Sequence, residues 1–239
     1  MKADIESGTY QGIPYKIYAH PEPERLIFIN HGVYGTKERI LTMFGMTLAK
    51  LGYTVIAIDA SKHGERGEAP FSPRDNAVAL SHLFDVVEKT SEDIRLFYHG
   101  RFADTFDSFD ILGISMGGYV AYHMTTVSDK VRALITMISS PDFTAGAKDS
   151  DLTEREIRAI ETMDPSKHVH KMHFEAGLAL VGDRDTLIAK AQTYDFVQAH
   201  PELPLQVKTY DTDHQVVHAM QADIVDFLKG LNSKKTSIK

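Results

Sequence analysis

The segment that most constrains the fold covers residues 109–122 and reads FDILGISMGGYVAY. An apolar strand leads into Gly-x-Ser-x-Gly, and a helix-like stretch follows at once. A serine on such a sharp turn must take a strained backbone conformation, and Gly113 and Gly117, which lack Cβ atoms, let the neighbouring chain pass close to it. The pattern therefore predicts that Ser115 is an exposed nucleophile, with the helix N-terminus near Met116 facing the place where an oxyanion forms.

Apolar runs rich in β-branched and aromatic residues alternate with helix-length periodic segments along the rest of the chain. This alternation is typical of βαβ units, so we expect an α/β fold with a mostly parallel central sheet flanked by helices. The expected strands cover residues 9–18, 25–30, 53–58, 109–114, 132–138, 175–181 and 205–210. The expected helices run from a cap at Thr36 to Gly52, from Ser72 with a break near 90–93, and over 117–127, 187–199 and 215–230.

The stretch between residues 139 and 175 fits no simple crossover connection. Thr153-Glu-Arg-Glu156 is a helix start signal, and Asp164-Pro165 ends that helix. Loops of this length inside a compact domain are usually functional or mobile. We therefore expect a single domain over residues 1–239, with a small helical lid inserted at about 143–173.

A serine nucleophile needs a base to take its proton and a carboxylate to orient that base. Loops at the carboxyl ends of parallel strands gather into one crevice. Asp183 and Asp185 both follow the expected strand at 175–181, and Asp185, which lies deeper in the loop, is the preferred acid. His214 follows the last expected strand, whereas His218 should lie one turn along the next helix. The three groups then occur in the order Ser115, Asp185, His214.

The loop after the expected strand at 25–30 reads His31-Gly-Val-Tyr-Gly35 and precedes a helix. Such a turn can present the Val33 amide toward the Ser115 hydroxyl. Together with the Met116 amide, it would make a two-donor oxyanion hole. The alternative interpretation is a plain β-to-α turn, which any α/β protein can contain.

With these four elements, the chain resembles the α/β-hydrolase superfamily over essentially its whole length. Residues 59–67, DASKHGERG, resemble the Asp-x-x-x-His-Gly-x-Arg-Gly segment of small bacterial esterases related to the prolyl oligopeptidase family. The resemblance implies an α/β-hydrolase fold and a serine esterase mechanism. It puts Ser115, Asp185 and His214 at the triad positions and Val33 and Met116 at the oxyanion positions, and it implies no particular substrate.

Two further groups of residues receive no chemical role. In the family that the chain resembles, the segment containing Asp59, His63 and Arg66 is mainly structural. The histidines of the sequence HVHKMH at 168–173 have the look of a metal site, but no clear carboxylate partner accompanies them, so we interpret them as solvated. We expect no bound metal.

Composition limits the kinds of binding partner and the cellular location that we expect for this chain. With 239 residues, 43% hydrophobic and 25% charged, the chain fits one soluble globular domain. A net charge of −7 argues against nucleic acid or an anionic membrane as a partner. The absence of cysteine and of a signal-like apolar run leads us to expect a cytoplasmic protein. A homodimer stays open, because nothing in the sequence sets the oligomeric state.

These observations predict a serine hydrolase that cleaves carboxylic esters of small molecules, with short acyl chains preferred and no cofactor required. Thioesterase, lactonase, amidase or acyltransferase activity could use the same residues, because a fold does not fix a substrate. We expect lid residues, with Tyr34 and Phe71, to form the leaving-group pocket. A different class of function, a small-ligand binding protein on the same scaffold, is the remaining alternative.

Overall fold

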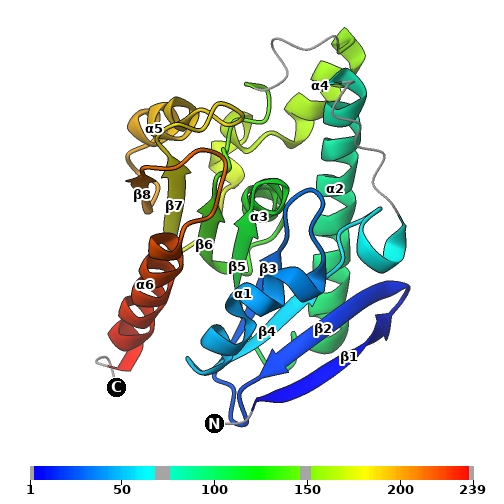
Figure 1. Ribbon diagram of the computed structural model, residues 1–239, viewed down its shortest axis with the longest axis vertical. Helices are drawn as coiled ribbons and strands as arrows, with labels where there is room; N and C mark the ends of the chain where they lie inside the picture. The colour runs from blue at the N-terminus through cyan, green and yellow to red at the C-terminus, as the bar shows by residue number, and fades with distance from the viewer. Residues whose placement is uncertain (1–2, 68–75, 146–151, 237–239) are drawn as a thin grey trace.

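The computed structural model describes residues 3–67, 76–145 and 152–236 (Figure 1). In these residues an eight-stranded sheet has the spatial order β1-β2-β4-β3-β5-β6-β7-β8. The strands are β1 (Asp4–Tyr10), β2 (Ile13–Ala19), β3 (Arg25–Asn30), β4 (Tyr53–Ile58), β5 (Phe109–Ile114), β6 (Val131–Met137), β7 (Ala176–Gly182) and β8 (Leu205–Tyr210). The α-helices are α1 (Lys37–Ala49), α2 (Asn76–Arg101), α3 (Met116–Val127), α4 (Glu154–Met163), α5 (Lys190–Ala199) and α6 (His218–Thr236).

Helices cover both faces of the sheet, as Figure 1 shows. Alternate side chains of a strand point to opposite faces, so β3 sends Ile27 and Ile29 into one core and Leu26 and Phe28 into the other. The first core lies under α1 and α6, and the second lies under α2 and α3. Strands buried on both faces read as continuous apolar runs, which is why the central strands were recognisable in the sequence.

Strands β3 to β8 run parallel in the sheet, and β1 and β2 are antiparallel additions at one edge. The register aligns the carboxyl ends of the parallel strands: Asn30 pairs with Gly113, and Ile114 pairs with Met137. The loops that leave these ends therefore start side by side. This alignment brings together segments that are distant in the sequence.

The single strand expected at residues 9–18 is wrong. The chain folds back there as a hairpin, with β1 and β2 antiparallel and Tyr10 opposite Ile13. The two loop residues, Gln11 and Gly12, have φ angles of 49° and 80°. Positive φ at both positions is what a two-residue hairpin turn requires, and the Gln-Gly pair is the local signal for it.

The break expected in the second helix near residues 90–93 is also wrong, because α2 runs unbroken from Asn76 to Arg101. The polar side chains that look like a cap have other partners. Thr90 Oγ1 accepts from the Ser61 amide, and Asp93 forms an ion pair with Arg66. The helix start expected at Ser72 lies outside the described residues.

The helices expected at 187–199 and 215–230 begin later, at Lys190 and His218. The residues before them form turns instead of helix. Inside the 143–173 segment, α4 begins at the expected place, since Thr153 and Glu156 form a reciprocal capping box. This helix lies beside the N-terminal end of α2 (Figure 1). The role of this segment as a lid stays a prediction. Among the helices described, none is long and apolar enough to cross a bilayer.

Candidate active site

Ser115 lies on the turn between β5 and α3, with φ 52° and ψ −114°. This conformation is rare for a residue with a side chain and costs free energy that the surrounding structure must supply. The Ser115 amide donates to the Met137 carbonyl at 2.9 Å, and the Ser115 carbonyl accepts from the Gly118 amide at 2.8 Å. The backbone on both sides of the serine is therefore held in place.

Two glycines make this turn possible, as their spacing in the sequence predicts. A Cβ atom on Gly113 would lie 1.9 Å from the Gly117 carbonyl oxygen, and one on Gly117 would lie 2.2 Å from the Asn30 carbonyl oxygen. Both collisions are with backbone, which cannot move aside as a side chain can. The close approach of β3, β5 and α3 thus depends on the absence of side chains here.

Gly117→Ala is expected to destabilise the protein by roughly 1–3 kcal/mol, because its new methyl group must displace the end of β3. Gly230→Ala is the matched control, since Gly230 lies in α6 with nothing within 4 Å of an added Cβ. That control should stabilise the helix by up to about 1 kcal/mol. Urea denaturation of both variants measures the difference, and equal free energies of unfolding would contradict the steric argument.

The three residues predicted as a triad lie together at the carboxyl edge of the sheet. Ser115 Oγ is 2.9 Å from His214 Nε2, and His214 Nδ1 is 2.8 Å from Asp185 Oδ2. The Asp185 side chain is buried, and its Oδ1 accepts from the amides of Leu187 and Ile188, each at 2.9 Å. Those two amides hold the carboxylate in place, and the same contacts keep residues 187 and 188 in the loop that precedes α5. His214 is then oriented by a group that cannot turn.

The alternative acid and base, Asp183 and His218, have other surroundings. Asp183 is exposed and forms an ion pair with Lys190, which holds the pKa of the Asp183 carboxyl below its usual range. His218 is exposed as the first residue of α6, as expected. The Asp213 side chain, next to His214 in sequence, is exposed as well.

Val33 and Met116 are brought near Ser115 by the turn after β3 and by the start of α3. Val33 and Ser115 line one cavity, and a Cβ atom on Gly32 would lie 3.5 Å from Ser115 Cβ. In the described part of the chain, neither the Val33 amide nor the Met116 amide donates to a backbone carbonyl. An oxyanion hole needs two such unengaged donors, and the role of Val33 and Met116 in one stays a prediction.

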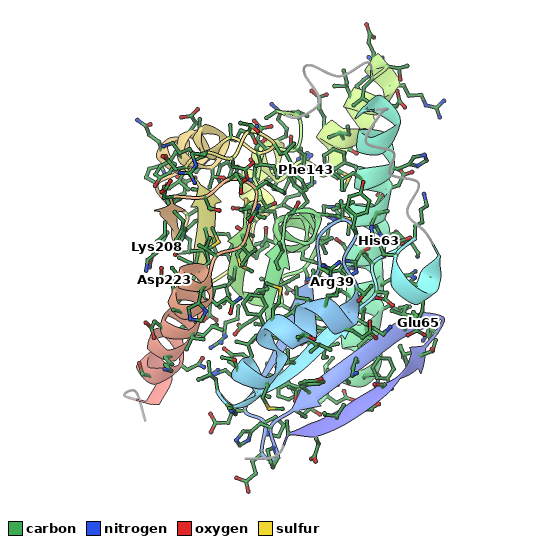
Figure 2. All side chains as sticks on the ribbon, viewed as in Figure 1. Arg39, His63, Glu65, Phe143, Lys208 and Asp223 are labelled. Carbon is green, nitrogen blue, oxygen red and sulfur yellow. The ribbon has the colours of Figure 1, made fainter. Side chains whose placement is uncertain are left out.

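A cavity of about 520 Å³ opens beside Ser115 and His214. Its apolar wall consists of Ile40, Met43, Ile114, Ile138, Leu187 and Val216, and Arg39 and Tyr34 also line it. Of the expected leaving-group residues, Tyr34 lines the cavity and Phe71 lies outside the described residues. No described residue of the 143–173 segment lines it, and Figure 2 shows Phe143 well apart from Arg39. Arg39 is not among the predicted site residues, because in the sequence it looks like an ordinary solvent-facing helix residue.

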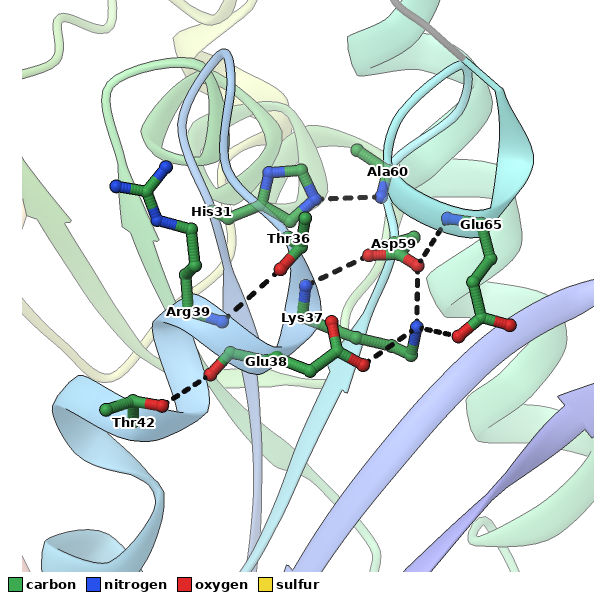
Figure 3. A network of polar contacts seen from close by, with 9 residues as sticks. All are labelled: His31, Thr36, Lys37, Glu38, Arg39, Thr42, Asp59, Ala60 and Glu65. Atoms are coloured by element: carbon green, nitrogen blue, oxygen red, sulfur yellow. Dashed lines mark hydrogen bonds and ion pairs between the residues drawn. The ribbon is translucent and has the colours of Figure 1, made fainter.

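A buried polar network supports the turn that carries Val33 (Figure 3). His31 Nε2 accepts from the Ala60 amide at 3.1 Å, and His31 Nδ1 lies 2.9 Å from the Gly32 carbonyl oxygen. These contacts describe a neutral imidazole with its proton on Nδ1. Beside it, Asp59 binds Lys37, the first residue of α1. The DASKHGERG segment thus contacts the turn that carries Val33 and the start of the helix that follows it.

His31 should make the protein less stable as the pH falls from 6.5 to 4. Burial lowers the pKa of His31 to about 4, so the unfolded chain takes up a proton in this range before the folded one does. The His31 contribution is complete above pH 6.5 and is reduced by roughly 3 kcal/mol near pH 4. Urea denaturation across this range should give a shallower pH dependence for His31→Gln, and an unchanged slope would contradict the assignment.

No protein-family model matches the chain. A Bacillus subtilis (strain 168) protein named "Putative esterase YitV" is 24% identical over 256 residues, covering 94% of this chain and 98% of that protein. The structure of TT1662 from Thermus thermophilus matches with a TM-score of 0.83 and 22% identity, covering 96% of this chain and 98% of the other. Est1E from Butyrivibrio proteoclasticus, solved with ferulic acid, matches with a TM-score of 0.68 and 18% identity over 97% and 99%. The eight-stranded, mostly parallel sheet and these structural matches show that the chain has the α/β-hydrolase fold, as the sequence predicts.

Proposed function

We propose that this protein is a serine hydrolase that cleaves carboxylic esters through an acyl-enzyme on Ser115. The observation that carries the proposal is the hydrogen-bonded line from Asp185 through His214 to Ser115, with both distances below 3 Å. The name of the Bacillus subtilis relative, "Putative esterase YitV", supports the same class of reaction, and Est1E was solved with a carboxylic acid, ferulic acid, bound.

In the first half of the reaction, Ser115 Oγ attacks the ester carbonyl carbon as His214 Nε2 takes the hydroxyl proton. The carbonyl oxygen becomes an oxyanion, which the amides of Val33 and Met116 stabilise. The Asp185 carboxylate stabilises the imidazolium that forms. When the tetrahedral intermediate collapses, the bond to the leaving oxygen breaks and His214 donates its proton to that oxygen, which releases an alcohol.

In the second half, water attacks the acyl carbon while His214 takes one of its protons. The second tetrahedral intermediate collapses with loss of Ser115 Oγ, which regains a proton from His214, and the carboxylic acid leaves. Each step uses protein groups and water, so the mechanism calls for no metal or organic cofactor. A cavity of about 520 Å³ suits a small ester better than a long-chain lipid.

The test combines fluorophosphonate labelling with turnover of p-nitrophenyl acetate. The wild-type protein should react with the fluorophosphonate at Ser115, and Ser115→Ala should lose both the label and the turnover while it keeps its folded circular dichroism spectrum. A wild-type protein that is neither labelled nor active on esters and thioesters would favour the binding-protein alternative. Turnover that survives Ser115→Ala would overturn the mechanism.

A further inference from the structure

Arg39 is the one residue with a permanent charge among the described residues that line the cavity beside Ser115. No aspartate or glutamate is among these described lining residues, and most of the others are apolar. The two histidines of the lining, His31 and His214, are committed to the Ala60 amide and to the triad contacts. A charged substrate group that enters this cavity therefore meets a single fixed cation.

The guanidinium of Arg39 has no carboxylate partner in the part of the chain that the structure describes. Its Nη1 donates to the Tyr34 carbonyl oxygen at 3.2 Å, and its side chain is exposed. Lys37, two residues earlier on α1, differs completely, because Asp59, Glu65 and Glu38 surround its ammonium. Figure 3 shows the Arg39 side chain extending away from this acidic cluster. The charge of Lys37 is neutralised, and that of Arg39 is not.

The free donors of Arg39 suit a carboxylate. A guanidinium has five N–H groups in a planar fork, and the Tyr34 contact uses one of them. The fork that remains matches two carboxylate oxygens in a bidentate pair, which a lysine ammonium cannot do. The whole chain carries a net charge of −7, which repels anions at long range. A local cation at the cavity is what an anionic substrate would need.

The apolar residues that line the cavity indicate the chemistry of the rest of such a substrate. Tyr34 and Leu187 line the cavity and are 64% and 73% exposed, which is unusual for side chains of their size. A bound molecule with an apolar body would cover them and remove this surface from water. The cavity thus combines the proposed nucleophile Ser115, an apolar surface and the Arg39 cation in one lining.

From these observations we propose that the natural substrate is an ester that carries a carboxylate separated from the scissile bond by an apolar spacer, and that Arg39 binds this carboxylate. The inference rests on the proposed esterase function and adds a substrate class to it. Arg39 then determines specificity and takes no part in bond breaking.

The experiment compares two methyl esters that differ in one group. Monomethyl adipate ends in a carboxylate, and methyl hexanoate has a methyl group at the same place. The ratio of their kcat/KM values, from methanol release, should favour the anionic ester in the wild type. Arg39→Gln should lower that ratio by about tenfold through KM, Arg39→Lys should restore part of it, and Arg39→Glu should lower it further. Monomethyl succinate and monomethyl suberate vary the spacer.

Arg95→Gln is the matched control, because Arg95 is an exposed arginine on α2 that does not line the cavity. It removes the same charge and should leave the ratio unchanged. If Arg39→Gln slows both esters equally, Arg39 only supports the turn through Tyr34, and the inference is overturned. An Arg39→Gln ratio equal to that of the wild type also overturns it, with the esterase function intact. A wild-type protein inactive on both methyl esters and on p-nitrophenyl acetate overturns the proposed function itself.

Discussion

Asp185→Asn is expected to lower kcat on p-nitrophenyl acetate by about 10⁴-fold while the protein stays folded. The reason lies in the two amides that hold this side chain. Leu187 N and Ile188 N both donate to Asp185 Oδ1, so an asparagine must keep its oxygen there and turn its NH₂ group toward His214 Nδ1. His214 would then carry its proton on Nε2 and could no longer accept the proton of Ser115.

Asp183→Asn is the control for this prediction. Asp183 precedes Asp185 by two residues in the same loop, but its carboxylate faces solvent and pairs with Lys190. We expect its kcat to stay within about twofold of the wild type, since exposed ion pairs contribute little. An Asp185→Asn variant that keeps more than a tenth of the wild-type kcat, or an equal loss in both variants, would remove Asp185 from the mechanism.

The site residues could be located from the sequence because the parallel sheet gathers strand ends. Once Ser115, Asp185 and His214 were each assigned to the end of a strand, the fold placed them at one edge without further information. Asp185 was preferred over Asp183 because it lies deeper in the loop. In the structure, the amides of residues 187 and 188 donate to the Asp185 carboxylate and hold it in its buried position. The catalytic roles of these residues remain predictions until the variants are measured.

Some features could not be predicted from the sequence because they depend on contacts between residues that are far apart in the chain. Thr90 and Asp93 look like a helix cap because their side chains can bond to nearby amides, yet Ser61 and Arg66 bind them instead. The hairpin at Gln11 was missed for a different reason, since its turn is only two residues long and strand-forming residues flank it on both sides. Local patterns identify strands and caps, but they do not report which partner a polar side chain finally meets.

The ion-pair partner of Asp59 could not be predicted from the sequence either. Lys37 is the first residue of a helix, where a lysine is normally solvated, and nothing in the sequence marks it as buried. In the structure its side chain is 3% exposed, and Asp59 is 0% exposed. Asp59 Oδ1 accepts from the Lys37 amide at 2.9 Å, and Oδ2 accepts from Lys37 Nζ at 2.7 Å and from the Glu65 amide at 3.1 Å. This carboxylate joins the start of α1 to the end of β4.

Acid should weaken this junction. Burial alone would raise the pKa of Asp59, but the Lys37 ammonium and the amides of Lys37 and Glu65 outweigh burial and hold the pKa below its usual range. For a lowered carboxyl pKa, the stabilisation is complete above the unfolded value near 4 and is lost as the pH falls through the folded value. The Asp59 contribution therefore disappears at lower pH than that of His31, and the two windows can be separated.

Asp59→Ala is expected to destabilise the protein by about 2–4 kcal/mol at pH 7, because it leaves two amides without their acceptor and leaves the buried Lys37 ammonium with only the more exposed Glu38 and Glu65. The double variant Lys37→Met, Asp59→Ala removes the buried ammonium as well, so its loss should be smaller than that of Asp59→Ala alone. Glu154→Ala, which breaks the exposed pair with Arg158 in α4, should cost no more than about 0.5 kcal/mol. Urea denaturation of the three variants tests the argument. A double variant less stable than Asp59→Ala would show that the loss of the buried carboxylate beside the Lys37 ammonium is not what destabilises the single variant.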